Sequence, residues 1–287
     1  MGKKRIALLT LHGMGETKPS YADQLRESLI RRLNAEGDDD WGYLIFNSIY
    51  YQEQLQRSQE DYIAKISGKV DWSKSRQRFF YSFSDPVSLE ARKEQANSPY
   101  EVCQRTIVNA IDACLTRILE LNSTLPPVVI LAQSLGGQVI SNYIWDAQRY
   151  QVARSHPTSG IWRDGGPKDI AQSSVRDQFR RLASLRCLIT TGCNIPLFLG
   201  GNPNPQAINS STLSSTFEWL NYYDADDILG WPLADLSPSY AELVEDIKIQ
   251  SGGTFIRETP LSHGEYWHTD EFQLKLVEKL RAIIREG

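Results

Sequence analysis

Apolar residues in this chain gather in short stretches that are separated by longer segments with a different spacing. The short stretches are rich in aliphatic, β-branched or aromatic side chains, and they predict strands at residues 6–11, 43–51, 128–132, 185–191, 217–223, 246–250 and 254–257. The run at 128–132 reads Val-Val-Ile-Leu-Ala without a polar residue, as expected for a strand buried on both faces of a parallel sheet. This run is the expected centre of the sheet.

The segments between these strands carry apolar residues at helical spacing. They predict helices over residues 20–33, 99–121, 135–145 and 270–283. The second of these helices has a strong start, because Ser98 is a favoured N-cap, Pro99 suits the first helical position and Glu101 completes a capping box. Since strands and helices alternate without an internal repeat, right-handed crossovers predict an α/β protein with a doubly wound, mainly parallel sheet and helices on both faces.

The length and composition fit a single α/β domain. The chain has 287 residues and no break in composition, so residues 1–287 are expected to form one unit. Residues 52–98 are expected to cover the sheet as helices, with the alternative that an aromatic cluster at 79–83 lines an acyl pocket. The polar stretch at about 148–181 is long for a connection, and it predicts a lid or cap insertion.

Charge and cysteine content disfavour several classes of function. The chain has 31 basic and 35 acidic residues and a net charge of −4, which gives no basic face for nucleic acid or an anionic membrane. No apolar run reaches the ~18 residues of a membrane span, and the apolar segment after Arg5 is too short for a signal peptide. The four cysteines have neither metal-ligand spacing nor the density of a disulfide scaffold. We therefore expect a cytoplasmic protein.

Ser134 follows the central strand directly. It stands between Ala132 and Gly136, and helical spacing resumes just beyond it. A strand, a very short turn and a helix must then lie close together, which demands small residues at 132 and 136 and presents the serine hydroxyl at the edge of the sheet. The alternative is that Ser134 only caps the helix, because serine is a favoured N-cap residue.

Residues of catalytic type also follow other predicted strands. A His-Gly-Met-Gly motif that begins at His12 ends the first strand, Asp226 and Asp227 follow the strand at 217–223, and His263 lies beyond the last strand. Ligands of open parallel sheets bind at the carboxyl ends of the strands. We therefore expect these side chains to meet Ser134 at one edge of the sheet.

These loops resemble the motifs of the α/β-hydrolase family. The turn at Ser134 is similar to the nucleophile elbow of the family, with Ala132 in place of the usual first glycine, and the chain order Ser, Asp, His is also that of the family. The resemblance implies a catalytic triad in which Ser134 is the nucleophile, His263 is the base and Asp227 is the acid that orients the base.

The motif at His12 resembles the HGxG motif of the same family. By this resemblance the main-chain N–H groups of Met14 and Leu135 bind the oxyanion of the reaction. His12, Gly13 and Gln133 are then expected to bind the substrate.

The acid and the base each have a competitor in the sequence. Asp227 precedes Ile-Leu-Gly-Trp-Pro-Leu, which resembles the setting of the acid in the family, and Asp226 is the second choice. The simpler interpretation is that Asp224, Asp226 and Asp227 all cap the start of a helix. His263 lies in Ser-His-Gly-Glu-Tyr-Trp, which resembles the histidine loop of lipase-like members, and His268 is the second choice.

The resulting hypothesis is a serine hydrolase that cleaves a small-molecule carboxylic ester, with lipid esters and thioesters included, through an acyl-enzyme. It needs no metal or organic cofactor. Apolar residues near Phe79 and Leu197 favour an apolar acyl group. Two alternatives stay open: a non-catalytic protein of the same fold that binds a ligand or partner, and a peptidase or amidase. The sequence assigns no oligomeric state.

Overall fold

The structure is a full-atom computed structural model. It describes residues 2–15, 17–66, 69, 84–85, 87–90, 93–119, 125–153, 157, 159–169, 171, 173–251 and 262–286. The predicted strand at 254–257 and the aromatic cluster at 79–83 lie outside the described residues.

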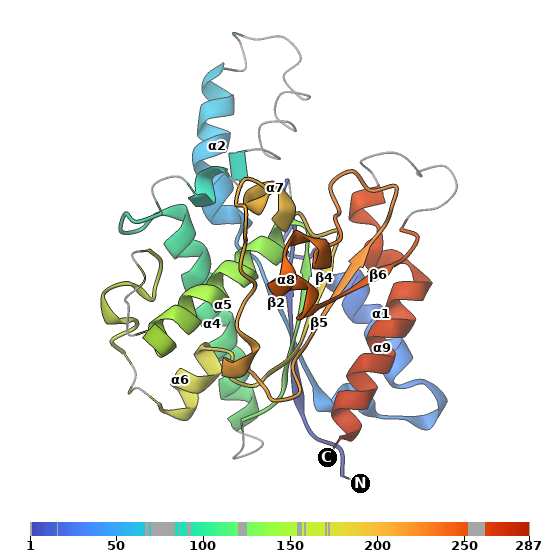
Figure 1. The fold of residues 1–287 in the computed structure, drawn as a ribbon. Helices are drawn as coiled ribbons and strands as arrows, with labels where there is room; N and C mark the ends of the chain where they lie inside the picture. The colour runs from blue at the N-terminus through green and yellow to red at the C-terminus, as the bar shows by residue number, and fades with distance from the viewer. Residues whose placement is uncertain are drawn as a thin grey trace.

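Six strands form one parallel sheet. In chain order, β1 to β6 are Ile6–Leu11, Leu44–Ile49, Val128–Gln133, Leu185–Thr191, Glu218–Tyr223 and Val244–Lys248. Across the sheet the order is β2-β1-β3-β4-β5-β6, and each adjacent pair is parallel (Figure 1). The direction of winding changes between β1 and β3, so their carboxyl ends border a topological switch point, where open sheets bind ligands. The predicted doubly wound sheet is thus confirmed, and Ser134 follows β3 at this point.

Helices cover both faces of the sheet. They are α1 (Asp23–Leu33), α2 (Gln52–Ile66), α4 (Pro99–Leu119), α5 (Leu135–Ala153), α6 (Val175–Arg180), α7 (Ile195–Leu199), α8 (Pro238–Ala241) and α9 (Asp270–Arg285). Helices α1 and α9 lie on one face, whereas α4 and α5 lie on the other (Figure 1). None of the helices in the described part of the chain is long and apolar enough to cross a membrane.

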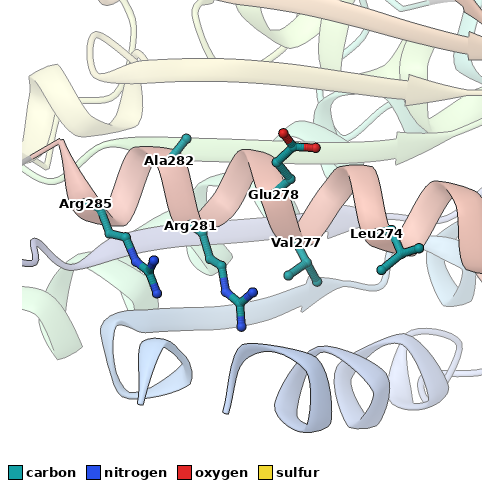
Figure 2. A pocket seen from close by; sticks show the side chains of 6 residues that line it. All are labelled: Leu274, Val277, Glu278, Arg281, Ala282 and Arg285. Carbon is teal, nitrogen blue, oxygen red and sulfur yellow. The ribbon is translucent and has the colours of Figure 1, made fainter. Parts of the chain in front are cut away.

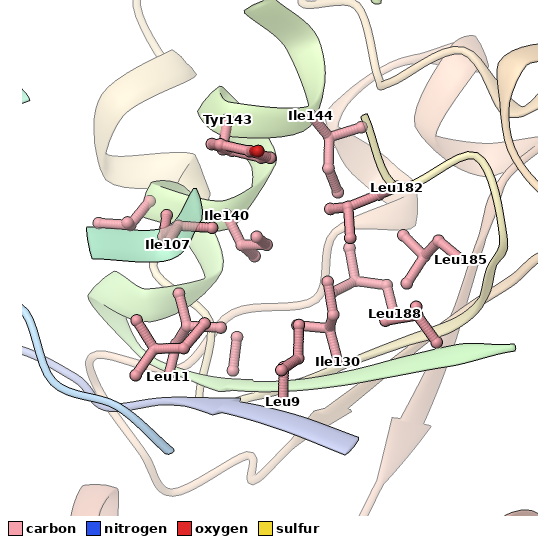
Figure 3. Packing of buried hydrophobic residues seen from close by; sticks show 14 of the residues in the cluster. Leu9, Leu11, Ile107, Ile130, Ile140, Tyr143, Ile144, Leu182, Leu185 and Leu188 are labelled. Carbon is pink, nitrogen blue, oxygen red and sulfur yellow. The ribbon is translucent and has the colours of Figure 1, made fainter. Parts of the chain in front are cut away.

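The central strands are buried on both faces, which explains their unbroken apolar runs. Successive side chains of a strand point to opposite faces, so Leu9 and Ile130 join the core under α4 and α5, whereas Leu8 and Leu131 join the core under α1 and α9. All four side chains are fully buried. Figure 3 shows the first of these cores, where residues of β1, β3 and β4 meet those of α4 and α5. Burial of this apolar surface is the main force that holds the sheet between its two helical layers.

The first helix starts three residues later than predicted. Helix α1 begins at Asp23, and Tyr21, which falls within the predicted range, lies in the turn before it. The hydroxyl of Tyr21 donates to the C=O of Thr10 at 2.7 Å. The tyrosine is therefore bound to the end of β1 and is not part of the apolar face of α1. The last described strand, β6, is likewise shifted by two residues from the predicted 246–250.

The stretch at 148–181 begins within α5, which runs to Ala153, and it ends just after α6, before β4. Trp162 is fully buried and its ring lies against Tyr143 and Tyr150 of α5. Arg180 of α6 pairs with Asp112 of α4 at 2.6 Å. These described parts lie against the helical layer, and α6 precedes the amino end of β4. A lid in this stretch stays a prediction.

A shallow cavity of about 490 Å³ lies along the outer side of α9 (Figure 2). All of its lining residues belong to this one helix: Leu274, Val277, Glu278, Arg281, Ala282 and Arg285. Arg281 and Arg285 also bind the buried carboxylate of Asp40, so they have a structural partner within the domain. This cavity is separate from the carboxyl edge of the sheet.

Candidate active site

Ser134 occupies a strained turn between β3 and α5. Its φ of 51° lies in the left-handed region that few non-glycine residues adopt. Its N–H donates to the C=O of Thr191 at 2.9 Å, and its C=O accepts from the N–H of Gly137 at 3.0 Å. The turn is thereby held between the neighbouring strand and the helix, as in a nucleophile elbow.

The geometry does not fit the alternative that Ser134 is a helix cap. A capping serine has an extended backbone, and its hydroxyl accepts a hydrogen bond from an N–H of the first turn. The Oγ of Ser134 is buried and has no hydrogen-bond partner in the described part of the chain. A strained residue with an unused hydroxyl at the edge of a sheet is instead typical of a functional site.

The helix that follows Ser134 approaches β1 as closely as a glycine allows. A Cβ atom at Gly136 would lie 2.6 Å from the carbonyl oxygen of His12 and 3.0 Å from that of Leu11. Ala132 is the register partner of Leu11 in the sheet, where a small side chain also suffices. The demand for a small residue at 136 thus comes from the backbone at and just beyond the end of β1.

The turn after β1 lies beside the nucleophile, and this turn and the start of α5 each offer one N–H group. A Cβ atom at Gly13 would lie 2.9 Å from the Cβ of Ser134, so this residue borders the serine directly. The N–H groups of Met14 and Leu135 donate to no other group among the described residues. Leu135 is the first residue of α5, where an N–H has no partner within the helix. Two free donors next to Ser134 suit an oxyanion site.

His12 supports this turn through both ring nitrogens. Its Nδ1 bonds the C=O of Gly13 at 2.8 Å, and its Nε2 accepts from the N–H of Tyr51 at 3.2 Å. The ring is 2% exposed and stacks on the ring of Tyr51. Burial lowers the pKa of His12 from 6.5 to about 4, although the bond to Gly13 acts in the opposite direction. With both ring nitrogens engaged, His12 positions Gly13 and the turn, and its contact with a substrate stays a prediction.

The buried, neutral His12 makes stability depend on pH. Between pH 6.5 and about 4 the unfolded chain binds a proton at this histidine that the folded protein does not, so stability falls as the pH falls through this window. Wild type is expected to lose about 3 kcal/mol of unfolding free energy through this residue between pH 7 and pH 4. Urea titrations at both pH values check this, with His12→Asn expected to lose about 3 kcal/mol less over the same interval. The exposed His268 gives a control, since His268→Asn should leave the wild-type difference unchanged; equal losses in wild type and His12→Asn would contradict the prediction.

Asp227 and His263 form a pair at the same edge of the sheet. The Nδ1 of His263 lies 2.7 Å from the Oδ2 of Asp227, and the Oδ1 of this carboxylate accepts from the N–H of Leu229 at 2.9 Å. Burial acts to raise the pKa of Asp227, but the hydrogen bond and the charge of His263 outweigh it, and the pKa is lowered. The anionic Asp227 requires the proton of His263 to be on Nδ1, which leaves Nε2 free to accept a proton.

The other two aspartates of the loop face elsewhere. The buried Asp224 accepts from the N–H of Ser251 and from its Oγ, the latter at 3.0 Å. Asp226 is exposed, and its N–H donates to Asp224 at 3.1 Å. Of the three candidates, only Asp227 contacts His263 in this structure.

His263 and Ser134 lie close to common neighbours but do not bond each other. A Cβ atom at Gly192 would lie 3.1 Å from the Cε1 of His263, and the preceding Thr191 bonds the backbone of Ser134. Gln133 also joins the two loops, because its Nε2 donates to the C=O of His263 at 2.9 Å. Both the Oγ of Ser134 and the Nε2 of His263 are buried and unpartnered among the described residues. Such bonds are often long or absent before a substrate binds.

The remaining sequence candidates differ in their relation to this arrangement. His268 is exposed and its N–H donates to the C=O of Glu265. Gln133, expected to bind substrate, uses its side-chain amide to hold the histidine loop. Within the described ranges no group of three or more His, Cys, Asp or Glu side chains could hold a metal ion.

Two residues of the site were not found from the sequence. The hydroxyl of Tyr266 donates to the Oδ2 of Asp227 at 2.8 Å, and the buried carboxylate of Asp85 accepts from the N–H of Gly15 at 3.3 Å. Asp85 is also bound by the side-chain amides of Gln52 and Gln59. Tyr266 lies three residues after His263 but in a separate 3₁₀ turn, so no helical period in the sequence pointed to it.

Among the comparisons with known proteins, only the one with solved structures finds proteins that are similar to this chain. No family model matches the chain, and no curated protein does. A variant of SOBER1 from Arabidopsis thaliana is 11% identical with a TM-score of 0.43, over 97% of this chain and 100% of that one. One of two fungal esterases from Rhizomucor miehei is 12% identical with a TM-score of 0.45, over 99% and 76%. Carboxyl esterase 2 from Tuber melanosporum is 10% identical with a TM-score of 0.43, over 97% and 78%.

Structural similarity at these identities and TM-scores says nothing about activity. The fold follows instead from features of the chain itself. The parallel order β2-β1-β3-β4-β5-β6 is combined with a serine at positive φ between the central strand and its helix. An acid follows β5 and a histidine follows β6, in the chain order Ser, Asp, His. With this topology and this turn, the chain has the α/β-hydrolase fold.

Proposed function

We propose that this chain is a serine hydrolase that cleaves carboxylic esters through a covalent acyl-enzyme intermediate. The observation that carries the proposal is the bond of 2.7 Å between His263 and Asp227 at the sheet edge where Ser134 stands at positive φ. A serine hydroxyl is a weak nucleophile at neutral pH unless a base accepts its proton. A histidine that an anionic carboxylate keeps in the Nδ1–H form is such a base.

In the first half of the proposed reaction, the Oγ of Ser134 attacks the carbonyl carbon of the ester. The Nε2 of His263 takes the hydroxyl proton, and Asp227 stabilises the resulting imidazolium. The negative charge that develops on the carbonyl oxygen is bound by the N–H groups of Met14 and Leu135. The carbon–oxygen bond to the alcohol then breaks, His263 returns its proton to the leaving alcohol, and the acyl group stays on Ser134.

In the second half, water replaces the alcohol. His263 removes a proton from a water molecule, which attacks the acyl carbon and again places negative charge on the oxygen held by the two N–H groups. When this intermediate collapses, the carboxylic acid leaves and the proton returns from His263 to Ser134. Each step uses the same side chains, and free enzyme is restored.

Exposed apolar side chains beside the site support an apolar acyl group. Leu197 on α7 is 55% exposed, and Ile228 and Trp231, from the loop that holds Asp227, are 66% and 40% exposed. The N–H of Trp231 donates to the C=O of Cys193 at 3.0 Å, which fixes this loop next to the residues that precede α7. Large apolar side chains grouped around a site are typical of surfaces that bind apolar ligands.

A fluorophosphonate probe tests the proposal. This reagent reacts with serines that are activated by a base, so we expect it to label native protein on the peptide that contains Ser134 and on no other serine. Labelling is measured by intact mass and peptide mapping, with heat-denatured protein as the control. A panel of p-nitrophenyl esters, thioesters and peptide amides is then assayed, and turnover of short and long acyl esters is expected to exceed that of amides.

Two outcomes contradict the proposal. Native protein that neither reacts with the probe nor hydrolyses any ester would favour a non-catalytic protein that binds a ligand in the same place. Probe labelling together with faster cleavage of amides than of esters would favour a peptidase or amidase.

A further inference from the structure

The hydroxyl of Tyr266 contacts the same carboxylate oxygen as His263. It lies 2.8 Å from the Oδ2 of Asp227, and the Nδ1 of His263 lies 2.7 Å from that oxygen on the other side. Both side chains come from the short loop that follows the undescribed stretch before residue 262, His263 from one 3₁₀ turn and Tyr266 from the next. A single oxygen of the acid therefore holds two donors from one loop.

The direction of the tyrosine bond follows from its second partner. The main-chain N–H of Asp224 donates to the hydroxyl oxygen of Tyr266 at 2.9 Å, and an N–H group can only donate. The proton of the phenol is therefore free to point at Asp227, which has only acceptors when ionised. A directed chain runs from Asp224 through Tyr266 to Asp227, and chains of this kind strengthen their members.

The surroundings of Tyr266 are shaped for this contact. Its ring is fully buried in the core under α1 and α9, so the hydroxyl is held by packing as well as by hydrogen bonds. A Cβ atom at Gly230 would lie 2.4 Å from the Oδ2 of Asp227 and 2.8 Å from the hydroxyl of Tyr266. A Cβ atom at Gly192 would lie 2.8 Å from the ring. Side chains at these two positions would separate the phenol from the acid.

We propose that Tyr266 is a positioning residue of the triad, which fixes the carboxylate of Asp227 relative to His263 and shares its negative charge. This inference rests on the proposed function. With the phenol in place, three donors hold the carboxylate; when the phenol is removed, only the N–H of Leu229 and the ring of His263 hold it, so its orientation is less restricted. The other ionisable side chains of the acid loop are Asp224, whose carboxylate faces Ser251, and the exposed Asp226.

Removal of the hydroxyl has two expected effects. Without the phenol, the charge of Asp227 acts on His263 alone, so the imidazolium is favoured and the acid limb of the kcat/KM profile moves to higher pH by about half a unit or more. The less ordered carboxylate also aligns the base less well, and kcat falls by about tenfold while KM changes by less than about twofold. If Tyr266 had a purely structural role, its replacement would lower the amount of folded protein but would not move the pH profile.

Tyr266→Phe in the full chain tests this proposal, with Tyr222→Phe as the matched control. Tyr222 is also buried in the core under α1 and α9, but its hydroxyl makes no hydrogen bond to the described residues. We expect the shifted pH profile and the lower kcat in the first variant only. Titration of the His263 ring followed by nuclear magnetic resonance in nitrogen-labelled protein gives a second readout that needs no substrate, and it should move in the same direction.

The two readouts separate this inference from the proposed function. An inactive wild-type protein would overturn the proposed function, while the resonance titration would still decide whether Tyr266 acts on His263. A folded Tyr266→Phe variant whose His263 titration and pH profile match those of wild type and Tyr222→Phe would overturn the role of Tyr266. Thermal unfolding of all three proteins checks that each is folded under the assay conditions.

Discussion

Replacement of Ser134 by alanine is expected to lower kcat for ester hydrolysis by about four to six powers of ten, because no other group can form the acyl-enzyme. The turnover that remains would come from the oxyanion donors and from substrate binding alone. The measurement is kcat and KM for a short and a long p-nitrophenyl ester, with fluorophosphonate labelling of the same samples. KM should change little, because alanine leaves the turn and its N–H groups in place.

The same substitution is expected to leave the protein as stable as wild type or more stable by about 1 kcal/mol. The hydroxyl of Ser134 is buried without a hydrogen-bond partner among the described residues, so its removal takes away a desolvation cost and none of the interactions described. Serine and alanine both carry a Cβ, so the strain at φ 51° stays nearly the same. Ser141→Ala on α5 is the control and should keep wild-type activity. Retained activity in Ser134→Ala would remove this serine from the mechanism.

Asp227→Asn is expected to lower kcat by about 10⁴-fold. In this structure the carboxylate receives three donors, from His263, Tyr266 and the N–H of Leu229. An asparagine amide has one acceptor oxygen and one NH₂ group, so it cannot accept from both sides. If the oxygen stays with Leu229, the NH₂ group faces His263 and forces the proton of the imidazole onto Nε2, where it cannot accept the proton of Ser134.

Asp226→Asn is the matched control for this prediction. Asp226 is the neighbouring residue and was the second choice for the acid, but it is exposed and does not contact His263. Its substitution should change kcat by less than about twofold, in line with the small effects of surface replacements. The assay uses the same esters over a range of pH. Loss of activity in Asp226→Asn with retention in Asp227→Asn would reverse the assignment of the acid.

The strands were predictable because both faces of this sheet are covered. Leu8 and Leu9 point to opposite layers, and both are buried, so β1 is apolar at consecutive positions from Ile6 to Leu9, as β3 is from Val128 to Ala132. The edge strand β6 lacks this signal: Glu245 is exposed and the strand reads Val-Glu-Asp-Ile-Lys, which placed its predicted bounds two residues late. A strand that is buried on one face alone has a mixture of apolar and polar residues, and loops can show the same mixture.

The candidate site was predictable where short motifs have a geometric cause. Gly136 must be small because β1 passes within contact distance of the helix start, and this requirement is visible beside Ser134 in the sequence. The choice of Asp227 over Asp226 came from the residues that follow it, and the structure brings Asp227, not Asp226, to His263. The supporting role of His12 was not predicted, since its ring is held by the N–H of Tyr51, 39 positions along the chain.

By itself the sequence determined the order of strands and helices, the tight turn at Ser134 and the presence of an acid and a base after later strands. These features depend on neighbours within a few residues, whose spacing is set by the periods of helix and strand. Only the tertiary structure decided that Tyr266 joins the acid, that His12 supports a turn and that Gln133 holds the histidine loop, 130 residues away. Such contacts arise when separate loops meet at one edge of the sheet, and no local period of the chain encodes which side chains will face one another there.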